Sequence, residues 1–465
     1  MSMSSSNGFD RRRWLQHVGG GMGVLALEQM LADGREVPKK NQLVSEQGGV
    51  HFVPRAKRVI HLFMNGGPFQ ADLFDPKPSL EKYAGQRPAS ADLLTERPTG
   101  GLLPSPFVFR PRGQSGLMIS DLLPNLSNFA DDLCVIRSMH ADNPNHGPAL
   151  LQMNNGTILP TRPSMGAWFL YGLGTENENL PGYLVFCPGR PVRFSILWNS
   201  AFLPSKYQGT YVNHSKINPN DMLPNLKNQY WSHETQLQQL ELLRDLNHQY
   251  QSTRNEQSIL EARLESMETA FRMQFEAREA FDLNLETKST IEAYGEGHFA
   301  NGCLLARRMV ERGVRFVQVY FGNGQPWDTH SNHDKSVPNL CRQIDQPIAA
   351  LLGDLKQRGL LEDTLVVWGG EFGRTPTSEN GSGRDHNHHG FSMWMAGGGV
   401  RGGMAYGKTD EFGFKAVENK VHVHDLHATI LHLLGLDHQR LTFRHSGRDF
   451  RLTDVYGRVV HDIIS

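Results

Sequence analysis

DTLVVWGGEFGRTP occupies residues 363–376 of the chain, and GRDHNHHG follows at residues 383–390. The apolar, β-branched run at 364–367 predicts a buried strand, which the next two glycines bring to an end. Glu371 comes directly after these glycines, and the second stretch adds three histidines. Ends of strands are where α/β folds place their ligands. The sequence therefore predicts an α/β fold with a metal or catalytic site at one edge of its sheet.

Other apolar runs predict the remaining strands of this sheet, at 58–64, 133–136, 183–186, 314–320 and 391–396. Helical segments are expected between them, at 149–153, 303–311, 337–358 and 425–435. Because strands alternate with helices, most neighbouring strands should be parallel. We expect an α/β domain at 50–465, with a mostly parallel central sheet flanked by helices.

A long segment at 231–291 has a different character from the rest of this domain. It is rich in Gln, Glu, Leu and Arg and has apolar residues at helical spacing. The apolar pattern breaks at 247–258, which favours two packed helices over one long coiled coil. We expect a helical insertion that serves packing or assembly, including a homo-oligomer, rather than chemistry.

The first 49 residues predict an export signal and a polar linker. Three arginines at 11–13 precede Trp14-Leu15 and a weakly apolar run at 18–27, which is too short to span a bilayer. This order resembles a twin-arginine export signal, and an amphipathic helix with a basic start is the alternative. We expect a periplasmic or extracellular protein without an integral membrane segment.

The charge balance limits the classes of partner. Lys and Arg number 47 and Asp and Glu number 48, so no overall basic field attracts nucleic acid or anionic lipid. The four cysteines are far apart in sequence and lack the CxxC spacing of a thiolate metal site. We interpret them as core thiols, although disulfides are an open alternative.

Polar groups follow three of the predicted strands. They are Asn65 with Asp72 and Asp75, then Asp328, His330 and His333, and then Glu371 with His386, His388 and His389. Imidazole and carboxylate ligands suit Zn²⁺ or Mn²⁺, whereas Ca²⁺ or Mg²⁺ would be favoured only if oxygen ligands dominate. Any one group alone is explained equally well by a turn or a polar loop. Three groups at three strand ends favour a metal or polar catalytic centre.

Several stretches together resemble a known family. They are the twin arginine, KRVIHLFMNGGP at 57–68, WDTH at 327–330, GEFGRTP at 370–376 and HDLHAT at 424–429. The combination resembles an exported bacterial family of unknown function that is sulfatase-like and belongs to the alkaline phosphatase superfamily. This resemblance covers nearly all of the chain after residue 50, and it implies a metal-dependent hydrolase of sulfate or phosphate esters.

The resemblance also implies roles by position. Asn65 takes the place of a first metal-binding Asp, Glu371 that of a later Asp, Asp328 with His330 or His333 forms the middle pair, and His386, His388 or His389 is the last histidine. Sulfatases have a Cys or Ser that becomes formylglycine, but here that position falls on His146. Either His146 is a nucleophile, ligand or acid–base group, or Ser138 or Thr157 replaces it, or the site is silent.

The expected function is hydrolysis of an anionic sulfate or phosphate ester, with a polysaccharide as one candidate carrier, but without the formylglycine motif. The expected metal ligands are Asn65, Asp328, His330, Glu371, His386 and His388, and the expected catalytic residues are His146 and Arg374. Arg374 could grip the anion bidentately, or it could make a surface salt bridge. The alternative is a catalytically silent secreted binding or scaffold protein with the same fold.

Overall fold

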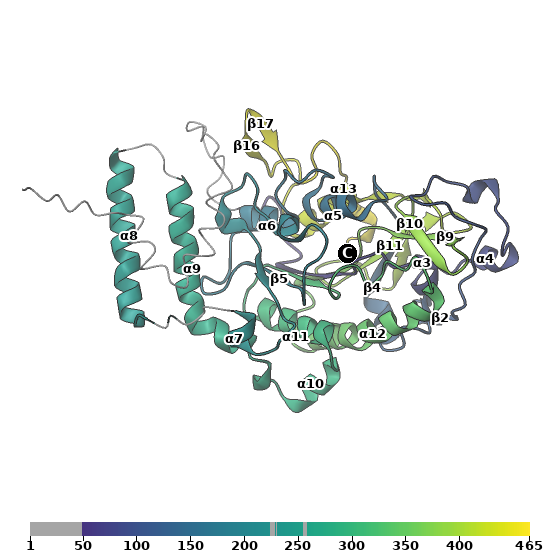
Figure 1. Ribbon diagram of the computed structural model, residues 1–465, viewed down its shortest axis with the longest axis horizontal. Helices are drawn as coiled ribbons and strands as arrows, with labels where there is room; N and C mark the ends of the chain where they lie inside the picture. Colours follow the sequence, from purple (N-terminus) through teal and green to yellow (C-terminus); the bar gives the residue numbers. More distant parts are fainter. Residues whose placement is uncertain (1–48, 224–227, 229, 254–257) are drawn as a thin grey trace, which may run out of the picture.

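A computed structural model describes residues 49–223, 228, 230–253 and 258–465 of the chain (Figure 1). The expected export signal at residues 11–27 lies outside the described residues. Within the described ranges, no helix is both long enough and apolar enough to cross a membrane. The four cysteines lie in this part of the chain, and all are buried and unpaired.

A nine-stranded sheet forms the centre of the molecule. Its spatial order is β12 (Met404–Tyr406), β4 (Leu133–His140), β11 (Phe391–Ala396), β8 (Thr364–Gly369), β1 (Arg58–Phe63), β7 (Phe316–Tyr320), β5 (Tyr183–Phe186) and β6 (Thr210–Val212), with β15 (Val421–His422) also paired to β4. Strand β11 is antiparallel to β4 and to β8, and the other pairs in this sheet are parallel. The predicted α/β fold with a mostly parallel sheet is confirmed.

Strand β1 shows why these segments are mostly apolar. Ile60 and Leu62 belong to one hydrophobic core, whereas Val59 and Phe63 belong to a second core on the other face of the sheet. Side chains alternate between the two faces of a strand, so a strand covered on both faces needs apolar residues at nearly every position. These strands therefore lack the alternation of apolar and polar residues that is typical of a half-exposed strand.

Helices cover both faces of this sheet (Figure 1). Helices α11 (His298–Glu311) and α12 (His333–Gln357) pack on one side and contribute to the first core. Helices α5 (His146–Asn155), α6 (Met165–Leu173) and α13 (Val423–Leu433) cover the other side and contribute to the second core. The result is a three-layer arrangement with the sheet in the middle.

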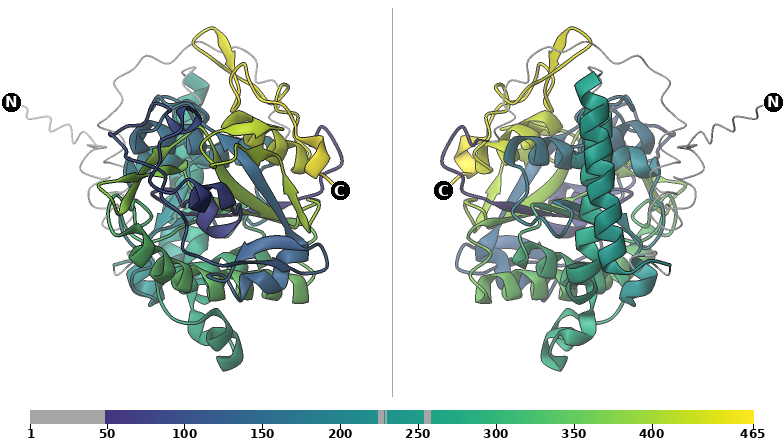
Figure 2. Two further views of the ribbon diagram at one scale, coloured as in Figure 1. Left: turned by 90° about the vertical axis from the view of Figure 1, so that its right-hand side faces the viewer. Right: turned by 90° about the vertical axis from the view of Figure 1, so that its left-hand side faces the viewer.

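The segment expected to be a helical insertion contains helices α8 (His233–Thr253) and α9 (Ser258–Phe281), which pack against each other. They stand at one end of the molecule, and α8 lies outermost (Figures 1 and 2). Leu240 is buried, whereas 46% of Leu237 is exposed. One face of α8 therefore supports the hairpin, and another face carries apolar residues that meet solvent.

The remaining elements are short. The helices are α3 (Gln70–Leu73), α4 (Pro78–Lys82), α7 (Pro219–Met222) and α10 (Lys288–Tyr294). The small antiparallel pairs are β2 (Phe109–Arg112) with β3 (Leu117–Ser120), β13 (Lys408–Thr409) with β14 (Ala416–Glu418), and β16 (Phe443–His445) with β17 (Arg448–Phe450). None of them belongs to the central sheet.

The histidine-bearing stretch after β8 is a hairpin rather than an irregular loop. Strand β9 (Gly373–Glu379) pairs antiparallel with β10 (Gly383–Asn387). Asn380 and Gly381 in the turn have φ values of 49° and 77°, a conformation that asparagine and glycine adopt most easily. The hairpin folds back over the edge of the sheet, so its polar residues are buried instead of facing solvent.

Candidate metal centre

Three loops meet at the carboxyl ends of the parallel strands β1, β7 and β8. The backbone N–H of Gly66, after β1, donates to Glu371 Oε1 at 3.0 Å. Gly66 has a φ of 106°, and a Cβ atom there would lie 2.4 Å from the backbone nitrogen of Asp328. A residue without a side chain is therefore required where the loops approach each other most closely.

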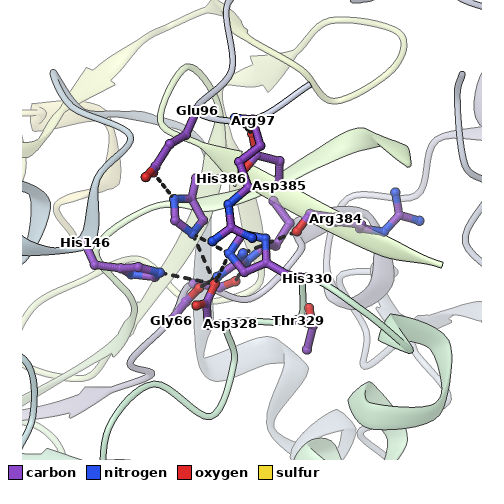
Figure 3. A network of polar contacts seen from close by, with 12 residues as sticks. Gly66, Glu96, Arg97, His146, Asp328, Thr329, His330, Arg384, Asp385 and His386 are labelled. Atoms are coloured by element: carbon purple, nitrogen blue, oxygen red, sulfur yellow. Dashed lines mark hydrogen bonds and ion pairs between the residues drawn. The ribbon is translucent and has the colours of Figure 1, made fainter. Parts of the chain in front are cut away.

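Asp328 is the centre of a group of three imidazole rings (Figure 3). Its Oδ1 atom lies 3.2 Å from His146 Nε2, 2.9 Å from His330 Nε2 and 3.1 Å from His386 Nε2. His146 is the first residue of α5, His330 follows β7, and His386 is part of β10. Residues from three distant parts of the chain thus direct the same ring nitrogen toward one point.

Each of these rings also contacts a glutamate through its other nitrogen. His146 Nδ1 lies 2.6 Å from Glu371 Oε1, and His386 Nδ1 lies 2.5 Å from Glu96 Oε2. His330 Nδ1 likewise contacts Glu379 Oε2. A neutral imidazole that donates Nδ1–H to a carboxylate is fixed in orientation and presents the lone pair of Nε2. The three glutamates therefore aim all three Nε2 atoms at the centre.

The pKa values show what these contacts do when only protons occupy the site. Burial raises the pKa of Asp328, but hydrogen bonds from the three histidines outweigh it, and the pKa is lowered. Burial lowers the pKa of His146, but the bonds to Asp328 and Glu371 outweigh it and raise the pKa to about 8. The bond to Asp328 also raises the pKa of His330, against burial. The arrangement thus favours the protonated forms of His146 and His330.

The donor set fits a divalent transition metal. His146, Asp328 and His386 each offer a ligand atom, and these atoms lie within 4.8 Å of one another. His330, Asp385 and His386 form a second, overlapping group. Imidazole and carboxylate donors backed by hydrogen-bonded glutamates suit a divalent transition metal, and a positive ion would take the place of the protons at the centre.

Arg374 lies inside this site and is fully buried. Its Nη2 atom is 2.7 Å from Asp328 Oδ1, and its Nε donates to the backbone oxygen of Gly67 at 3.1 Å. Nη2 also contacts Gly66 O, and Nη1 donates to Arg384 O at 3.3 Å. Every nitrogen of the guanidinium is therefore engaged within the protein, so Arg374 orients Asp328 and the turn after β1.

The other residues expected at the site occupy different positions. Asn65 is buried and donates its Nδ2 to Gly324 O at 2.7 Å, so its amide supports the loop after β7. Glu371 reaches the centre only through His146 and Gly66. His388 is outside both ligand groups, its ring centroid lies 3.9 Å from that of His389 with the planes tilted, and burial lowers its pKa to about 4. The structure does not bring His388 to Asp328.

The His333–Asp72 pair and the hydroxyls of Ser138 and Thr157, which the sequence also suggested, lie away from the centre. His333 Nε2 forms a buried pair with Asp72 Oδ2 at 2.6 Å, which joins the start of α12 to α3. Ser138 Oγ donates to Asn419 O at 2.6 Å, and Thr157 Oγ1 accepts from Leu159 N at 3.4 Å. These two hydroxyls are engaged in local structure.

Sequence reasoning missed Glu96, Arg97, Glu379 and Asp385. Glu96 and Arg97 belong to a Pro-rich segment without regular structure, which crosses the hairpin (Figure 3). The backbone N–H of Arg97 donates to Asp385 Oδ2 at 2.6 Å, and its side chain pairs with Glu379 at 3.1 Å. No motif surrounds Glu96. Asp385 directly precedes His386, and Glu379 lies on the opposite strand of the hairpin, so pairing of the hairpin was the signal that could have found them.

No curated protein matches the chain. Among solved structures, Ps i-CgsB in complex with k-i-k-neocarrahexaose is 10% identical over 82% of this chain and 72% of its own, with a TM-score of 0.37. The PsFucS1 sulfatase from Pseudoalteromonas sp. is 11% identical over 82% of this chain and 68% of its own, with a TM-score of 0.34. The alkaline phosphatase from the Antarctic bacterium TAB5 is 10% identical over 83% of this chain and 99% of its own, also with a TM-score of 0.34.

A family model accounts for nearly the whole α/β domain. It is described as "Protein of unknown function (DUF1501)", and it matches residues 56–464. The matched range includes all of the residues that converge on Asp328, and the chain belongs to the DUF1501 family.

Proposed function

We propose that this chain is a metal-dependent hydrolase of sulfate or phosphate esters, with the metal held by His146, His330, His386 and Asp328. The observation that carries the proposal is the convergence of three Nε2 atoms on Asp328 Oδ1, at 2.9 to 3.2 Å. Three histidines whose other nitrogens all face carboxylates are rarely needed for packing, whereas metal sites need this arrangement. Zn²⁺ fits the donors best, with Mn²⁺ next and Ca²⁺ disfavoured by the imidazoles.

The proposed chemistry uses water rather than a side chain as the nucleophile. A divalent ion bound here would lower the pKa of a coordinated water toward neutrality. His146 stands where sulfatases carry their nucleophile, but Glu371 and Asp328 engage both of its nitrogens. A ring held in this way is suited to ligation and poorly placed to attack an ester.

The experiment is an elemental analysis of purified protein, followed by assays on aryl sulfates and aryl phosphates with added Zn²⁺, Mn²⁺ or Ca²⁺. We expect about one bound zinc ion per chain, because the two candidate ligand groups share His386 and cannot both be filled independently. His386→Ala should lose the metal and any activity, whereas His388→Ala should keep both because His388 lies outside the ligand groups. A wild-type protein that binds none of these ions would contradict the proposal.

Export by the twin-arginine route, to the periplasm or beyond it, is part of the proposal. That route carries folded proteins, so a metal could be inserted before export. Replacing Arg11 and Arg12 together by lysine should retain the protein in the cytoplasm, as measured by cell fractionation. Unchanged export of this variant would contradict the twin-arginine prediction.

A second candidate function, as a binding or scaffold protein, is favoured by the exposed face of α8. Leu242 and Leu246, one helical turn apart on the same face, are 49% and 39% exposed. Apolar side chains gathered on an outer helix are typical of an association surface. Light scattering should show a smaller assembly when Leu242 and Leu246 are both replaced by glutamate. An equal mass for the variant and the wild type would contradict self-association through α8.

A further inference from the structure

The proposed hydrolase needs a positive group for the anionic end of its substrate, and the arginines inside the site are already engaged. Arg374 binds Asp328 and backbone oxygens. Arg384 is fully buried, donates to Thr375 O and Leu103 O, and lies over the ring of Phe69. Arg97 pairs with Glu379 at 3.1 Å. To bind one of these arginines, the anionic group of the substrate would have to break an existing contact, so a different guanidinium is the simpler binding group.

The guanidinium of Arg193 differs from these three because it is not engaged by other groups of the described residues. It lies against Gly147, the residue after His146. An ideal Cβ atom on Gly147 would lie 2.8 Å from both Nε and Nη2 of Arg193. The absence of a side chain at Gly147 therefore gives the guanidinium its place at the start of α5. Within the described ranges, the side chain of Arg193 has no hydrogen bond or ion pair, and the residue is exposed.

The backbone holds Arg193 in this position by an unfavourable conformation. Its φ is 71°, and that of Phe194 is 36°. Left-handed conformations cost residues other than glycine about 1 kcal/mol or more, and they concentrate at functional sites. A charged side chain without a partner, on a turn of this kind beside a metal site, points to a ligand that is anionic.

The start of α5 cannot supply this positive group by itself. The N–H of Gly147 is already capped by Asn145 Oδ1 at 3.1 Å, and the next residue, Pro148, has no N–H to donate. A free helix N-terminus would offer several donors to an anion, but this one has few left. The guanidinium of Arg193 is therefore the available charge at that end of the helix.

We propose that Arg193 is the anion-binding residue of the site and receives an oxygen of the sulfate or phosphate group beside His146. This inference rests on the proposed function. A planar guanidinium offers paired donors that match the oxygens of a tetrahedral anion. Arg193 would bind the group under attack, whereas Arg374 positions Asp328.

The test is the binding of inorganic phosphate to the zinc-loaded protein, measured by titration calorimetry. Arg193→Gln should weaken phosphate binding by about tenfold or more, because a charge-assisted contact is lost. Arg190→Gln is the matched control. It removes the same charge from the same segment, but the guanidinium of Arg190 lies over the Phe194 ring, 4.8 Å from its centroid. This control should bind phosphate as the wild type does, and all three proteins should hold equal amounts of zinc.

The outcomes separate this inference from the proposed function. A wild-type protein that binds no zinc contradicts the metal centre and, with it, the reaction. Zinc at full content, with phosphate affinity of Arg193→Gln within about twofold of the wild type, contradicts only the role of Arg193. Equal losses in Arg193→Gln and Arg190→Gln would also overturn it, because overall charge would then explain the effect. Zinc-loaded wild type that binds no phosphate overturns it as well.

Discussion

His146 Nε2 lies 3.2 Å from Asp328 Oδ1, although His146 begins helix α5 and Asp328 lies in the loop after β7. The same ring contacts Glu371 through Nδ1 at 2.6 Å. This bridging position suits a metal ligand. Removal of the ring tests that role against the role of a nucleophile, because loss of a ligand lowers zinc affinity whereas loss of a nucleophile lowers turnover alone.

Replacing His146 by alanine should lower zinc affinity by more than about 100-fold, because a ligand is lost outright, whereas losing a group that only supports a ligand already costs about 10- to 100-fold. Competition against a chromophoric chelator measures this affinity. If the variant instead bound zinc as tightly as the wild type but lost turnover, His146 would act as a nucleophile or acid–base group.

Glu96 should tune the metal through His386. Its carboxylate lies 2.5 Å from His386 Nδ1, and Glu96 lies in a segment without regular structure. Glu96→Gln should lower zinc affinity by about 10- to 100-fold, because the amide orients and polarises the ring less strongly. Asp92→Asn, in the same segment but paired with Arg87, is the control and should leave zinc affinity unchanged. Equal affinities for all three proteins would show that Glu96 does not support the site.

Gly66 should be intolerant of any side chain. Gly66→Ala adds a Cβ atom 2.4 Å from Asp328 N at a φ of 106°. We expect a loss of about 3 kcal/mol or more in the free energy of unfolding, from the backbone conformation and overpacking together. Gly85→Ala is the control, because Gly85 also has a positive φ but has open space around it, and it should lose about 1 to 2 kcal/mol. Urea denaturation measures both, and equal losses would contradict the close approach.

Acid should destabilise the fold through buried neutral histidines such as His427. Burial lowers the pKa of His427 to about 3, from 6.5. Its Nε2 bonds Met153 O at 2.8 Å, and its buried Nδ1 has no partner within the described ranges. The stability contributed by the neutral ring is fully present above pH 6.5 and is lost as the pH falls toward 3.

His427→Gln keeps a donor for Met153 O and cannot take up this proton. Between pH 6 and 4, its free energy of unfolding should fall less steeply than that of the wild type, by up to about 1.4 kcal/mol per pH unit. Urea titrations at several pH values measure the two slopes. Identical slopes would show that His427 does not couple folding to protons.

The sequence predicted the sheet because its strands are local patterns. Runs such as 59–63 and 364–369 are mostly apolar on both faces, which is typical of strands buried on both faces. The positions of Asp328 and His330 in the segment after a strand were readable for the same reason. The carboxyl ends of parallel strands share one edge, so residues that follow them lie close together.

Only the tertiary structure decided which polar residues meet at that edge. The hairpin of β9 and β10 turns His386 toward Asp328 and leaves His388 outside, although the two histidines are two positions apart. Glu96 joins the site from a segment that has no pattern of its own. The orientation of a side chain depends on how its segment packs against distant parts of the chain, and neither periodicity nor spacing records that. The sequence by itself determined the sheet and the edge that carries the polar residues, and packing alone selected the histidines that converge and the glutamates that hold them.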